Sequence, residues 1–123
     1  MPVDMTSRLP KYIGYTANKT RTAGITVSGV PVGTDALGLA YILGAADRAA
    51  SDPTFTTQFV VSPTSTVTLN AAEIVGMKNA AQTFVNAMFA AEASANAALT
   101  ATPPTIATFA DVDALFAAVP KAY

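Results

Sequence analysis

The sequence contains no cysteine, no histidine and no tryptophan in its 123 residues. Without cysteine no disulfide can form, and without cysteine or histidine there are no thiolate or imidazole ligands for a metal ion. A serine or threonine nucleophile would also lack a histidine to act as its base. We therefore expect a protein that is not an enzyme and that has no catalytic residues, no metal site and no cofactor.

Charged residues are scarce, at 12% of the chain against roughly 25% in ordinary globular proteins. Apolar residues make up 51%, which is the opposite of the composition of a disordered chain. The longest apolar run lies between Asp35 and Asp47 and is well short of the ~18 residues that a membrane span needs. The composition favours an ordered homo-oligomer without a membrane partner.

Residues 71–100 are predicted to form one long alanine-rich helix. Asn70 and Glu73 have the spacing of a capping box, and no proline follows until Pro103. Apolar or small residues recur at intervals of three and four, which is typical of a helix packed against another helix. We interpret this stripe as an oligomer interface; its residues are Ile74, Met77, Ala81, Phe84, Met88, Ala91 and Ala95.

Shorter elements are predicted on both sides of the long helix. Two β-branched runs joined by small residues predict a hairpin over 24–33, in which Pro31 requires an edge position. A helix follows over about 36–50, then a second hairpin over 55–69, and a short helix over 110–119 comes last. The predicted fold class is α+β, mainly α.

Two glycines interrupt the helix predicted over 36–50. Gly38 and Gly44 each weaken it by up to ~1 kcal/mol relative to alanine. We therefore expect tertiary support, or a close approach of another segment, at this helix.

Residues 1–22 show neither helical nor strand periodicity, and we predict an extended arm before a small α+β domain over 23–123. The arm has a net charge of +3 and the remainder a net charge of −4. A basic arm and an acidic body favour docking of the arm on a neighbouring subunit. Nucleic acid is the alternative partner, but the overall charge of −1 argues against it. The predicted docking residues are Arg8, Lys11, Tyr12, Tyr15, Lys19 and Arg21.

Two segments resemble a small, functionally uncharacterised domain family found in tail proteins of tailed bacteriophages and prophages. The first runs from Arg21 to Asp35 and combines an arginine, a Gly-Ile-x-Val-x-Gly hairpin and a Thr-Asp helix start. The second runs from Val67 to Ile74 and is followed by Phe84-Val85 and by residues 89–93. The resemblance covers roughly residues 21–119.

The resemblance implies a structural virion protein, placed in the tail fibre or in its attachment to the baseplate. It implies a virion location after synthesis in the cytoplasm of the bacterial host, with other tail fibre or baseplate proteins as partners. It also favours a trimer, because phage fibres are usually threefold. Two alternatives stay open: a tail-fibre assembly chaperone absent from the mature particle, and a head or neck decoration protein.

Overall fold

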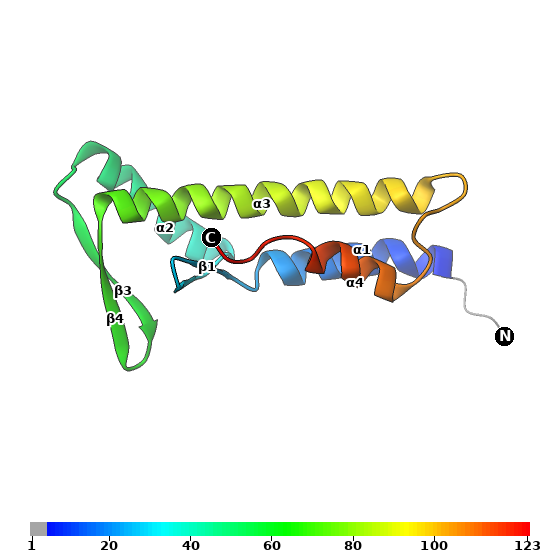
Figure 1. Cartoon of the computed structure of the whole chain (residues 1–123), viewed down its shortest axis with the longest axis horizontal. Helices are drawn as coiled ribbons and strands as arrows, with labels where there is room; N and C mark the ends of the chain where they lie inside the picture. Colours follow the sequence, from blue (N-terminus) through cyan, green and yellow to red (C-terminus); the bar gives the residue numbers. More distant parts are fainter. Residues whose placement is uncertain (1–4) are drawn as a thin grey trace. The chain divides into compact units, whose positions relative to one another are not determined.

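The computed structural model describes residues 5–123 and confirms the predicted α+β, mainly α fold (Figure 1). The helices and strands of these residues are α1 (Met5–Arg21), β1 (Ile25–Val27), β2 (Val30–Val32), α2 (Ala36–Ser51), β3 (Thr56–Ser62), β4 (Ser65–Asn70), α3 (Ala71–Thr100) and α4 (Phe109–Ala117).

The chain forms two compact units, and the long helix contributes to both. The helical unit contains the described residues up to Arg21 together with Phe84–Pro120. The hairpin unit contains Thr22–Thr83 and Lys121–Tyr123. This division differs from the predicted one, in which residues 23–123 form a single domain.

The prediction of an extended arm is wrong, because residues 5–21 form helix α1. Leu9, Ile13 and Ala17 are spaced by four residues, and all three are buried. They form one face of the helix, and α1 packs against α4. Pro10 lies inside the helix, where it cannot donate a backbone hydrogen bond; burial of the apolar face outweighs that loss. The predicted arm residues 1–4 lie outside the described part of the chain.

In the helical unit, α1 and α4 run in the same direction, and residues 101–108 reverse the chain between α3 and α4 (Figure 1). The short helix predicted over 110–119 is confirmed as α4, and it starts with a capping box. The Thr108 side chain accepts from the backbone N–H of Asp111, and the Asp111 carboxylate accepts from the backbone N–H of Thr108. Hydrogen bonds from the backbone N–H groups of Ala107 and Thr108 hold the pKa of Asp111 below its ordinary value.

The hairpin predicted over 24–33 is confirmed as β1–β2. Ser28 and Gly29 form its turn with φ of 50° and 80°, the backbone that matches the twist of a two-residue hairpin. At its base the Gly24 N–H donates to the Thr34 hydroxyl at 2.9 Å. Thr34 is fully buried, so this hydrogen bond satisfies a polar group inside the core.

The C-terminal residues extend this small sheet. Ala122 lies parallel to Thr26 on β1. Thr26 donates its backbone N–H to Lys121 O at 2.9 Å and accepts from the Tyr123 N–H at 2.8 Å. The last three residues therefore act as a third, very short strand.

Helix α2 begins as the sequence predicts, with the Asp35 carboxylate accepting from the Gly38 N–H at 2.8 Å. The two glycines of this helix differ in how much space a side chain would have. A Cβ on Gly38 would lie 2.5 Å from Gly33 O, whereas a Cβ on Gly44 would meet nothing within 4 Å. The expected close approach therefore exists at Gly38 and not at Gly44.

The second predicted hairpin is also confirmed, as β3–β4. Its pairing register shifts between Val60 and Ser62. It leads directly into α3, whose start has the predicted capping box. The Glu73 N–H donates to Asn70 Oδ1 at 2.9 Å, and the Asn70 N–H donates to Glu73 Oε1 at 3.1 Å.

The stripe along α3 is not an open interface. Six of its residues are buried within the single chain: Ile74, Met77, Ala81, Phe84, Met88 and Ala95. Ala91 is half-buried. The periodicity correctly marks the packed face, but this face is covered by the chain's own side chains. The prediction that it forms the oligomer interface is therefore wrong for these six residues.

Candidate functional site

Helix α1 gathers most of the predicted docking residues on one exposed face. Arg8, Lys11, Tyr12, Tyr15 and Lys19 follow one another at intervals of three, one, three and four residues, which places them side by side on a helix. Tyr12 is half-buried and the other four are exposed. We call these five residues, together with Phe109 of α4, the aromatic–basic surface.

Tyr12 fixes this surface to the neighbouring helix. Its ring stacks on that of Phe109 with the centroids 4.2 Å apart, and its hydroxyl donates to Asp113 Oδ1 at 2.6 Å. The hydrogen bond to Asp113 is the main reason why the pKa of Tyr12 lies above its ordinary value. The phenol is therefore held in its neutral, hydrogen-bonded form.

Tyr15 and Lys19 continue the surface along α1. The Tyr15 ring lies 6.3 Å from that of Tyr12, and Lys19 Nζ lies 6.0 Å from the centre of the Tyr15 ring. Tyr15 remains 61% exposed. An open hollow of about 390 Å³ lies in this region, lined by Arg8, Lys11, Tyr12, Tyr15 and Phe109. Its cations suit carboxylates and its rings suit apolar or planar groups.

A family model matches residues 9–118, which is most of the chain, including most of α1 and all of α4. The chain belongs to the family described as Domain of unknown function (DUF4376). No curated protein and no solved structure matches it. All residues of the aromatic–basic surface except Arg8 lie within the matched DUF4376 domain.

Arg21 does not join the aromatic–basic surface. Its guanidinium donates to Asn18 Oδ1 at 2.8 Å and lies 5.8 Å from the centre of the Phe89 ring on α3. Phe89 is 54% exposed. Arg21 therefore covers part of an apolar side chain inside the helical unit, and its predicted role in docking does not fit this geometry.

Sequence reasoning missed two members of the site in the DUF4376 domain. Phe109 and Asp113 lie on α4, about a hundred residues after Tyr12, and no local pattern links them to α1. The signal that was available is the spacing of Leu9, Ile13 and Ala17, which predicts a helix and thereby places the basic and aromatic residues on one face.

Within residues 5–123, no group of three acidic side chains is close enough together to hold a metal ion. No helix of that range has the length and apolar character to cross a membrane. The chemistry of the aromatic–basic surface is that of binding, through charge and ring contacts.

Proposed function

We propose that this chain is a structural part of the tail of a tailed bacteriophage, in the tail fibre or in its attachment to the baseplate. It acts through contacts with other copies of itself and with other tail proteins, and the favoured homo-oligomer is a trimer. The phage context is supported by the resemblance of residues 21–35, 67–74, 84–85 and 89–93 to a domain family of tail proteins.

The aromatic–basic surface is the observation that carries the docking role. Aromatic residues and arginine are enriched in protein interfaces, and tyrosine and arginine contribute much of the binding energy there. Here Tyr12 is already held by Asp113 and Phe109, so little side-chain freedom is lost when a partner binds. A cationic surface with a fixed aromatic ring at its centre fits an acidic segment of a neighbouring subunit.

Quantitative mass spectrometry of purified virions tests the structural role. We expect the chain in a fixed ratio to the major tail protein, and the copy number distinguishes a fibre from a baseplate ring. Absence from virions combined with abundance in the infected lysate would contradict the proposal and favour an assembly chaperone. Recovery with isolated heads would favour a decoration protein.

A charge reversal tests whether the aromatic–basic surface is the docking site. Lys11→Glu places a carboxylate in the hollow and is expected to lower incorporation into virions at least tenfold. Lys78→Glu on α3 makes the same change of net charge outside this surface and is the matched control. Equal incorporation of both variants would exclude this surface.

A further inference from the structure

The two hairpins differ in how their outer edges are closed, and the first is closed on both sides. On β1, the backbone N–H and C=O of Thr26 point outward and pair with Lys121 and Tyr123. Pro31 is the antiparallel partner of Thr26, so its backbone groups point outward on the opposite edge. A proline has no N–H to offer there. Neither edge of β1–β2 is therefore a good template for another strand.

The second hairpin has none of these protections. Within residues 5–123, the strands β3 and β4 pair with each other and with no further strand. Neither strand contains a proline, and no charged residue occurs from Pro53 to Ala72. Natural sheets usually protect such edges with prolines, charges or covering segments. The only such feature here is the irregularity between Val60 and Ser62, which leaves Thr56–Val60 regular.

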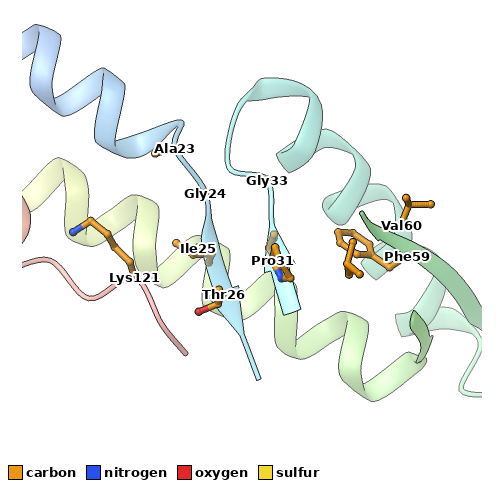
Figure 2. Close-up of a pocket in the computed structure, with 11 residues that line it drawn as sticks. Ala23, Gly24, Ile25, Thr26, Pro31, Gly33, Phe59, Val60 and Lys121 are labelled. Atoms are coloured by element: carbon orange, nitrogen blue, oxygen red, sulfur yellow. The ribbon is translucent and has the colours of Figure 1, made fainter. Parts of the chain in front are cut away.

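Open space separates β3 from the nearest part of the first hairpin. A trough of about 570 Å³ is bounded by Pro31 and its neighbours on one side and by Phe59, Val60 and Val61 on the other (Figure 2). The two hairpins belong to separate sheets, so β2 does not complete the ladder of β3. Val60 is 67% exposed, whereas its neighbours Phe59 and Val61 are half-buried.

We propose that Thr56–Val60 pairs antiparallel with the same segment of a second copy of this chain, across a two-fold axis at Gln58. An uncharged strand has no like charges to repel each other when it meets itself, and it offers nothing to select a charged partner. An isologous contact requires such self-complementarity, since the same surface serves both copies.

With the two-fold axis at Gln58, the side chains on both faces of the strand meet compatible side chains of the second copy. On the exposed face, Thr56 meets Val60 of the second copy, and the two Gln58 amides meet each other. On the opposite face, Thr57 meets Phe59 of the second copy. Cross-strand pairs of β-branched and aromatic residues stabilise antiparallel sheets. The irregularity after Val60 lies outside the paired segment, and the result is a four-stranded sheet shared by two chains.

This pairing identifies a self-association surface for the proposed structural role, but it does not require a phage partner or the aromatic–basic surface. It can therefore fail while the virion experiment succeeds, and it can succeed while that experiment fails. An isologous two-fold contact cannot form within a threefold ring, so in the favoured trimer this pairing joins chains of two different trimers.

The absence of native cysteine permits a direct test with single-cysteine variants. In Gln58→Cys the two thiols face each other across the axis, at a separation of Cα atoms of about 5 Å that a disulfide can bridge. Mild oxidation is expected to convert most of this variant to a dimer on a non-reducing gel. Gln82→Cys, at an exposed position of α3, is the matched control and is expected to stay monomeric. Equal cross-linking of both variants would overturn the proposal.

Association without cross-linking gives a second measurement. Sedimentation equilibrium of the unmodified protein is expected to show a dimer, and Gln58→Lys, which brings two ammonium groups together at the axis, is expected to weaken it at least tenfold. Gln82→Lys adds the same charge elsewhere and should leave the dimer intact. A monomer at all concentrations, or an assembly unaffected by Gln58→Lys, would contradict the pairing.

Discussion

The hairpins β1–β2 and β3–β4 have similar local construction, but they are integrated differently into the hairpin unit. In the first, Ile25 and Val32 are buried, the C-terminal residues cover one edge and Pro31 blocks the other. In the second, Leu69 is the one buried residue of the two strands, and within residues 5–123 neither outer edge pairs with a further strand. The first hairpin is completed by its own chain, whereas the second leaves backbone hydrogen-bonding groups for a partner.

This difference shows why exposure alone is a weak guide to function. Single exposed apolar residues are normal on protein surfaces, and Val60 would attract no interest if its strand were covered. What distinguishes β3 is the combination of exposure, missing charge and unpaired backbone groups in one segment. The aromatic–basic surface differs again, because its exposed side chains surround one ring, that of Tyr12, which is already held in place by Phe109 and Asp113.

The largest contrast is expected from placing one lysine in each hairpin. Val32→Lys puts a charge where the native side chain is buried, and it should lower the free energy of unfolding by about 4 kcal/mol or more. In the monomer, at protein concentrations below self-association, Val60→Lys should change it by no more than about 0.5 kcal/mol, because the site is exposed. Urea denaturation measures both. Similar losses in the two variants would show that the second hairpin is as firmly integrated as the first.

Deletion of Lys121–Tyr123 would remove the cover from the edge of β1. Three backbone hydrogen bonds join these residues to Thr26 and Ser28. At roughly 0.5–1.5 kcal/mol for each bond, the expected loss of unfolding free energy is about 3 kcal/mol. The control is the double variant Lys121→Ala/Tyr123→Ala, which keeps the backbone bonds and should lose less. If control and deletion lose the same amount, the side chains and not the backbone pairing stabilise this edge.

The two glycines of α2 test how tightly the end of the first hairpin meets the helix. Gly38→Ala would place its Cβ 2.5 Å from Gly33 O, and relief of that overlap should cost about 2 kcal/mol of unfolding free energy. Gly44→Ala has open space and should stabilise the protein by up to about 1 kcal/mol. Thermal unfolding distinguishes the two signs. A stabilising Gly38→Ala would mean that the hairpin end is free to move away from α2.

The sequence was sufficient to predict both hairpins and three of the helices, because each has a local chemical signal. Asn70 with Glu73 and Thr108 with Asp111 mark helix starts through hydrogen bonds made within four residues. Helix α1 was missed because Pro10 and the many threonines argued against a helix, while its apolar face is formed by only a few residues. Tertiary burial of Leu9 and Ile13 decided the outcome.

What the sequence could not predict concerns contacts between distant segments. A periodic stripe on α3 shows that one face is covered, but it does not show whether Phe84 meets the same chain or another chain. The pairing of Tyr12 with Asp113 and of Thr26 with the C-terminal residues has no local pattern. The interface residues predicted on α3 became core residues for this reason.

The smallest expected effect is a pH dependence at the entry to the second hairpin. The Asp52 carboxylate accepts from the Thr54 hydroxyl at 2.6 Å and from the Thr54 N–H at 3.0 Å, and these hydrogen bonds hold the pKa of Asp52 below its ordinary value of 3.8. The unfolded chain therefore binds the proton more readily, so the stabilisation is present above pH 3.8 and is lost as the pH falls through the lower pKa of the folded state. In Asp52→Asn the unfolding free energy should depend less on pH over that acidic range.

Asp111 gives the matched comparison, because its pKa is also lowered but it caps α4 in the other unit. Asp111→Asn should remove the part of the pH dependence that comes from Asp111 and leave the part that comes from Asp52. The unfolding free energy of the double variant should therefore depend less on pH than that of either single variant. Urea titrations at several pH values measure all three variants. An unchanged slope in Asp52→Asn would mean that the turn before β3 is not formed in solution, and the second hairpin would then be even less integrated than the static contacts indicate.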